Sequence, residues 1–159
     1  MRNKKLVFVF SLLFILLTGC GEKTILPYEE AYKKLDDAGY EIIASKDENE
    51  ILDKIHELSE SYDISIEKNG PIFSPYVEHN PQSLAENVSG FILAKKDISF
   101  AFIFYCNDGD TSYIIGRLFD ELSGQFIAPN QRVMGGSDNT YFYFCSYDVN
   151  AILNLSDDD

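Results

Sequence analysis

The chain beyond its apolar N-terminus begins with a helical pattern. Apolar residues at a spacing of three or four run from Tyr28 to Leu35, which predicts a helix over residues 28–38. Gly39 follows this stripe and is typical of the residue that ends a helix. The next segment, residues 40–45, is rich in β-formers, so a strand is expected directly after the helix.

The following segment predicts a second helix and then a second strand. Apolar residues share one helical face over residues 47–61, namely Ile51, Leu52, Ile55 and Leu58. Apolar and polar residues alternate over residues 62–68, which predicts a half-buried strand. Three prolines interrupt residues 69–89, so a long loop is expected there, with one helical turn at 82–86.

Two apolar runs in the middle of the chain predict a β-hairpin. They cover residues 91–95 and 98–106 and are separated by Lys96 and Asp97, which suit a turn. The second run is apolar at successive positions rather than at alternate ones. We therefore expect this strand to lie in the centre of a sheet that is covered on both faces.

Residues 110–123 predict a third helix. Asp110 or Thr111 can cap its start, and Gly124 can end it. A strand over 111–115 is the weaker alternative. The apolar residues at helical spacing are Ile114, Ile115, Leu118, Phe119 and Leu122.

The C-terminal part predicts further strands. Residues 125–134 are expected to form a strand, residues 135–139 a turn, and residues 140–147 a final strand rich in aromatic side chains. Residues 157–159 are three aspartates, which indicates an acidic tail. Together these elements predict a single α+β domain over residues 28–156, with about three helices packed on a mostly antiparallel sheet of four to six strands.

The first 20 residues have the three-part pattern of a bacterial export signal. Three basic residues precede a 12-residue apolar stretch, residues 6–17, in which only Ser11 is polar. That stretch is too short for a transmembrane helix, which needs about 20 apolar residues. Residues 1–19 are therefore expected to be a signal peptide.

The end of this signal resembles the lipobox of bacterial lipoproteins. The motif is Leu17-Thr18-Gly19-Cys20: an aliphatic residue, a small or polar residue, glycine, then cysteine. The resemblance implies cleavage after Gly19, a diacylglyceryl thioether on the Cys20 sulfur and frequent acylation of the new amine, with palmitate as a typical chain. Residues 20–27 would then be the lipidated N-terminus and a short linker, which places the domain at the cell membrane on its extracytoplasmic face.

Two further segments resemble small Firmicute-type lipoproteins of unknown function. They are AYKKLDDAGYEII at residues 31–43 and KKDISFAFIFYCNDGDTSYIIGRLFDEL at residues 95–122. Such proteins open with a helix, a glycine, an aromatic residue and a strand, and later have a strand followed by a helix. The resemblance supports the fold class and implies no active site.

The charge of the chain restricts its partners. The full sequence has 13 basic and 26 acidic side chains, a net charge of −13. Removal of the signal takes Arg2, Lys4 and Lys5 with it and leaves a balance of −16. A domain this acidic repels nucleic acid and anionic lipid headgroups, so membrane attachment is expected through the lipid anchor alone.

Cys106 and Cys145 remain as a pair after lipidation of Cys20, and an even pair in an exported protein suggests a disulfide. Strand parity argues against it. Cys106 shares a face with Phe104, whereas Cys145 lies opposite Phe144. If both Phe faces point to the core, the two sulfurs lie on opposite sides of one sheet. Two separate buried or half-buried thiols are therefore favoured.

No motif in the sequence predicts a catalytic, cofactor or metal site. His56 and His79 have no ligand-spaced partners and are expected at the surface. Residues 107–110 (NDGD) depart from the EF-hand pattern, so a turn and helix cap is expected there instead of a calcium loop. No nucleophile elbow, S-x-x-K, P-loop or dinucleotide fingerprint occurs.

The aromatic final strand offers the one candidate binding surface. Tyr141, Tyr143 and Tyr147 would share one sheet face, unless a helix covers that face, which is the favoured alternative. The sequence thus predicts a non-enzymatic lipoprotein that binds an envelope protein or cell-wall partner. A small envelope hydrolase and an inhibitor or immunity-type protein are the alternatives.

Overall fold

The computed structural model describes residues 25–69, 81–122, 127, 129, 131–138 and 140–153, with the backbone alone for 61–69 and 120–122. Five antiparallel strands form one sheet in the order β1-β2-β3-β5-β4. The strands are β1 (Glu41–Ser45), β2 (Val88–Lys96), β3 (Ser99–Cys106), β4 (Val133–Asp138) and β5 (Tyr141–Ser146). The expected α+β class is confirmed, and the strand expected in the centre, β3, lies there.

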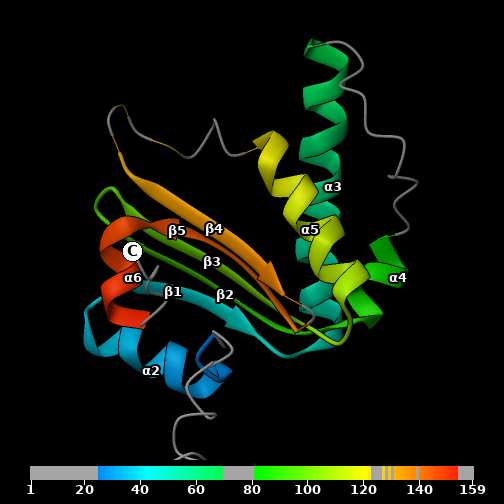
Figure 1. Ribbon diagram of the computed structural model, residues 1–159. Helices are drawn as coiled ribbons and strands as arrows, with labels where there is room; N and C mark the ends of the chain where they lie inside the picture. The colour runs from blue at the N-terminus through cyan, green and yellow to red at the C-terminus, as the bar shows by residue number, and fades with distance from the viewer. Residues whose placement is uncertain are drawn as a thin grey trace, which may run out of the picture.

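The described residues contain five helices, where about three were expected. They are α2 (Tyr28–Asp37), α3 (Glu48–Asn69), α4 (Pro81–Glu86), α5 (Gly109–Leu122) and α6 (Tyr147–Leu153). Figure 1 shows α3 and α5 against one face and one end of the sheet, whereas α2 and α6 lie against the other face. The molecule is therefore a three-layer arrangement in which neither helical layer covers a whole sheet face.

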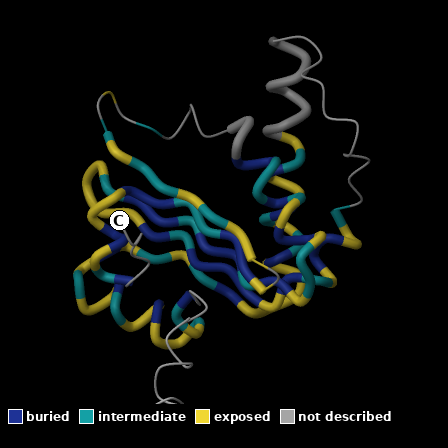
Figure 2. Tube along the Cα trace, viewed as in Figure 1, coloured by how far each residue is buried: buried dark blue, intermediate teal, exposed yellow. Residues whose placement is uncertain are grey.

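The sheet separates two hydrophobic cores. Phe104 belongs to the cluster under α3 and α5, and its neighbour Ile103 belongs to the cluster under α2 and α6. Both are fully buried. This explains why β3 is apolar at successive positions, because adjacent residues of a strand face opposite sides. Figure 2 shows the buried residues concentrated in the central strands.

The strand expected at residues 62–68 is wrong, because helix α3 continues without a break through Asn69. The alternation of Tyr62, Ile64 and Ile66 fits a strand, but Leu58, Tyr62 and Ile66 also continue the i, i+4 spacing of the helix. No glycine or proline interrupts the segment before Gly70. Once a helix is nucleated, its extension costs less than starting a new element.

The turn expected at residues 135–139 is also wrong for residues 135–138. These residues belong to strand β4, which covers Val133–Asp138. Glycines are depleted in strands, which made this segment look like a turn. Here a side chain at either glycine would crowd the aromatic rings of β5. A Cβ on Gly136 would lie 2.8 Å from Cε1 of Tyr143 on β5, and one on Gly135 would lie 3.2 Å from Cδ2 of Phe144.

The final strand is shorter than expected, and an unforeseen helix follows it. β5 ends at Ser146, and α6 begins at Tyr147. Val149 and Leu153 of α6 are fully buried against the α2 side of the sheet. Seven residues are too few to establish a clear helical period, so the sequence pattern alone did not predict this helix.

The start of α5 is capped by Asp108, not by Asp110 or Thr111. One carboxylate oxygen of Asp108 accepts a hydrogen bond of 2.7 Å from the backbone N–H of Thr111, and the other accepts one of 3.1 Å from its hydroxyl. The helix expected at 110–123 and the turn-and-cap interpretation of residues 107–110 are confirmed, with the cap two residues earlier.

Candidate functional site

A groove lies where α3 and α5 leave the sheet uncovered. Both helices pack at one end of the sheet, and the β2–β3 hairpin projects beyond them (Figure 1). The groove has a volume of about 730 Å³, within the range of ligand pockets. We call it the hairpin groove; its principal walls are Ile43, Lys54, Leu93, Ile98, Phe100 and Phe102.

The floor of the hairpin groove is aromatic. The ring of Phe100 lies 5.3 Å from that of Phe102 and 5.4 Å from that of Phe144, and Phe102 in turn lies 5.0 Å from Phe119 of α5. These centroid distances are typical of favourable aromatic pairs. The floor is thus continuous with the core beneath α5.

Two large aliphatic side chains stand exposed at the rim of the groove. Ile43 on β1 is 63% exposed, and Ile98 in the hairpin turn is 68% exposed. Single exposed apolar residues are common on protein surfaces, but these two border the same apolar floor. Phe100 itself is buried, so Ile43 and Ile98 are the most exposed apolar side chains of the groove.

The charged rim of the groove carries both signs. Lys54 and Glu57 of α3 form an ion pair, Glu41 and Lys95 lie on β1 and β2, and Asp97 lies in the hairpin turn. Exposed pairs of this kind contribute little to stability because water and salt screen them. Charged rims of binding sites set the register of a complex more than its affinity.

Polar contacts fix the hairpin that forms the groove. Asp97 adopts a positive φ of 53°, which closes the turn between β2 and β3. Gln131 donates a 2.6 Å hydrogen bond from Nε2 to the carbonyl oxygen of Ile98. On the neighbouring strand β5, the Ser146 hydroxyl accepts from the Phe100 N–H at 2.6 Å and donates to its carbonyl at 3.0 Å.

The two cysteines lie on opposite faces of the sheet, as strand parity predicted. Cys106 is buried in the cluster beneath α3 and α5, and Cys145 in the cluster beneath α2 and α6, and both thiols are free. Burial, with smaller effects of Asp108 and Asp148, raises the pKa of each thiol to about 12. Both sulfurs are therefore protonated near neutral pH, when a thiol is a poor nucleophile and a poor metal ligand.

The candidate tyrosine surface on β5 does not form. Tyr141 is buried and Tyr143 half-buried, with their rings 6.1 Å apart in the cluster that α2 and α6 cover. Tyr147, 54% exposed, lies at the start of α6 rather than on the strand. The alternative in which helices cover this face is therefore the observed one. The hairpin groove was missed, although Ile43 and Phe100 were assigned to strands.

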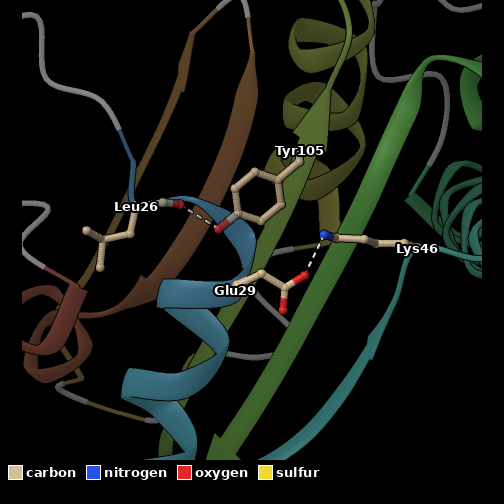
Figure 3. Close-up of polar contacts among 4 residues, drawn as sticks. All are labelled: Leu26, Glu29, Lys46 and Tyr105. Carbon is tan, nitrogen blue, oxygen red and sulfur yellow. Dashed lines mark hydrogen bonds and ion pairs between the residues drawn. The ribbon is translucent and has the colours of Figure 1, made fainter.

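A cluster of contacts fixes the N-terminal end of the described chain to the α2 side of the sheet. The hydroxyl of Tyr105 on β3 donates to the carbonyl oxygen of Leu26 at 2.8 Å, and Lys46 donates to Glu29 at 2.7 Å (Figure 3). The Lys46 ammonium also lies 4.3 Å from the centroid of the Tyr28 ring. We call these five residues the N-terminal clamp.

The clamp also corrects the extent of the linker. Ile25 is only 9% exposed and packs in the α2 cluster, together with half-buried Leu26. Both residues were expected in the linker that follows Cys20, but they belong to the folded domain. Cys20 itself, the whole signal segment and His79 lie outside the described residues, whereas His56 is exposed on α3.

Other site types are not found in the described part of the chain. No group of three or more His, Cys, Asp or Glu side chains there is arranged to hold a metal ion. None of the described helices is long and apolar enough to cross a bilayer. No protein-family profile matches the chain, and searches of curated proteins and of solved structures find no significant match.

Proposed function

We propose that this chain is a lipid-anchored extracytoplasmic protein that binds a partner of the cell envelope without catalysing a reaction. The observation that carries the proposal is the hairpin groove, where Ile43 and Ile98 stand exposed at the rim beside the half-buried Phe102 and the buried Phe100. Apolar surfaces of this kind on otherwise acidic domains are typical of interaction sites.

The lipobox-like motif that ends at Cys20 supports the lipid anchor. Cys20 precedes the buried Ile25 by five residues, which span at most about 17 Å when fully extended. Because the N-terminal clamp holds Leu26 on the α2 side, a lipid on Cys20 would keep that side close to the bilayer. The hairpin groove lies on the opposite sheet face and would be directed away from the membrane.

The partner is expected to be a protein of the envelope that offers an apolar contact. The net charge of −16 after signal removal favours partners that are basic around that contact and disfavours nucleic acid. A non-enzymatic role is supported by the protonation of both buried thiols, which leaves Cys106 and Cys145 poorly suited to nucleophilic catalysis.

Site-specific photo-crosslinking in living cells tests the binding role. A photoreactive phenylalanine analogue is placed at Ile43 or Ile98 of the full chain, and at Tyr32 on α2 as the control. Tyr32 is also exposed but lies on the other helical layer. We expect one adduct of reproducible mass from both groove positions and not from Tyr32. Adducts that are absent from the groove, or identical at all three positions, would contradict the proposal.

A further inference from the structure

Strand β4 is an edge of the sheet, and among the described residues it pairs with β5 alone. The unpaired side of an edge strand presents N–H and C=O groups that can bind another strand. The backbone groups of β4 that point away from β5 follow from the register of the β4–β5 pair.

The register determines which residues point outward. The N–H of Tyr147 donates to the carbonyl oxygen of Arg132 at 3.0 Å, so this pair is hydrogen-bonded across the β4–β5 ladder. In an antiparallel ladder such pairs recur at every second residue. The residues between them, Val133, Gly135 and Ser137, consequently direct their backbone groups away from β5.

Val133 and Ser137 lie two residues on either side of Gly135. Two opposite charges are also placed at equal distances from it. Arg132 lies three residues before Gly135 and Asp138 lies three residues after it. Both are exposed. Their positions have the same parity, so their side chains lie on one face of the sheet. The edge is thus self-complementary: rotated by 180° about Gly135, it places an arginine opposite an aspartate twice.

We propose that β4 is the interface with a second copy of this chain. The two β4 strands run antiparallel about a twofold axis through Gly135, so that Val133 of one copy pairs with Ser137 of the other. Arg132 then faces Asp138 of the second copy in a non-hydrogen-bonded pair, the geometry that brings side chains closest. The same surface on both subunits is used, as in most twofold dimers.

The surroundings of β4 agree with this pairing. Gly135 lies at the axis and has no side chain, so no side chain there meets its own symmetry mate. A groove of about 320 Å³ separates β4 from α5, and Tyr113 of α5, 54% exposed, borders it. The opposite edge, β1, lacks the same symmetry, because Glu41 at one end would face Ser45 of a second copy.

The proposed axis is also compatible with a common membrane. An axis perpendicular to the sheet places the α2–α6 layers of both copies on the same side, so both N-terminal clamps face one bilayer. The net charge opposes association of free copies. Two-dimensional confinement on a membrane raises the effective concentration and offsets this repulsion.

Charge exchange between two tagged full-length copies tests the proposal. Differently tagged chains are co-expressed, the membranes are solubilised in mild detergent, and the co-precipitated fraction is measured. In Arg132→Asp or Asp138→Lys alone, both cross-strand pairs become like-charged, and we expect about a tenfold loss of co-precipitation. Co-expression of R132D with D138K restores opposite charges at both pairs and should restore the wild-type fraction. Lys33→Asp on α2 is the matched control and should have no effect.

The outcomes separate the interface from general effects. Recovery in the mixed pair shows that each single variant folds and that the lost contact is specific. Co-precipitation that is absent from the wild type, or that both single variants keep unchanged, would overturn the proposal. So would a loss in the single variants that the mixed pair does not recover.

Discussion

The phenolic oxygen of Tyr105 lies 2.8 Å from the carbonyl oxygen of Leu26, 79 residues earlier in the chain. This hydrogen bond joins the central strand of the sheet to the segment just before α2 (Figure 3). Burial raises the pKa of Tyr105 well above its usual value, so the hydroxyl stays protonated and remains a donor. The N-terminal end of the described chain is therefore fixed to the core.

Removal of that hydroxyl should weaken the domain measurably. Tyr105→Phe leaves the Leu26 carbonyl without its partner, and we expect the free energy of unfolding to fall by about 1 kcal/mol. Urea denaturation measures the change. Tyr113→Phe is the matched control, because Tyr113 is exposed on α5 and should shift the midpoint little. An equal effect of both substitutions would contradict a structural role for the bond.

The two buried thiols should make stability decrease in alkaline solution. Each has a pKa of about 12 in the folded protein against 9.0 for the ordinary thiol. The unfolded chain therefore loses these protons first, and stability present below pH 9 is lost progressively as the pH rises toward 12. Denaturation midpoints measured from pH 7 upward would show the decline.

The Cys106→Ala/Cys145→Ala variant provides the control for this pH dependence. Its midpoint should decline less steeply above pH 9, whatever its absolute stability. Tyr105 contributes in the same direction, since its pKa is also raised by burial, so some slope should remain. A slope unchanged by the double substitution would show that the thiols do not carry the effect.

The cap of α5 can be located by a pair of alanine substitutions. Asp108→Ala removes both hydrogen bonds to Thr111 and should cost about 0.5–2 kcal/mol of stability. Asp110→Ala removes only an exposed charge in the first helical turn, for which a smaller loss is expected. Thermal or urea unfolding of both variants would compare them. A larger effect at Asp110 would place the cap where the sequence had suggested it.

The glycines of β4 should be intolerant of side chains at one specific position. Gly136→Ala places a methyl group 2.8 Å from the Tyr143 ring, and we expect a loss of about 1–3 kcal/mol from overpacking. Ser137→Ala on the same strand is the control and should change the unfolding free energy by less than about 0.5 kcal/mol. Similar values for the two variants would show that Tyr143 moves away at little cost.

Local signals in the sequence were sufficient for much of the fold. The β2–β3 hairpin, helix α5 and the opposite placement of Cys106 and Cys145 follow from short-range periodicity and strand parity. The prediction failed where one apolar spacing fits two kinds of element. Tyr62 and Ile66 of α3 are four residues apart, which fits both a helical face and one face of a strand. The prediction also failed where the decisive contact is distant in sequence, as for Gly136 against Tyr143.

The candidate site could not be predicted in the same way. The hairpin groove exists because α3 and α5 cover only part of one sheet face, and the extent of that cover is set by packing between distant elements. In the sequence, Phe100 and Ile43 have the pattern of ordinary strand residues. Only the fold places both of them at the hairpin groove. The tyrosines of β5 were conspicuous in the sequence but are covered in the structure by α2 and α6.

The most direct test of the proposed anchored role is the intact mass of the full-length gene product extracted from membranes, together with that of its N-terminal peptide. We expect a chain that begins at Cys20, lacks residues 1–19 and carries a diacylglyceryl group on the Cys20 sulfur. Cys20→Ala should abolish the lipid, whereas Cys106→Ala should retain it. A chain that still begins at Met1, or one that begins elsewhere with Cys20 unmodified, would contradict the lipoprotein role and the orientation derived from it.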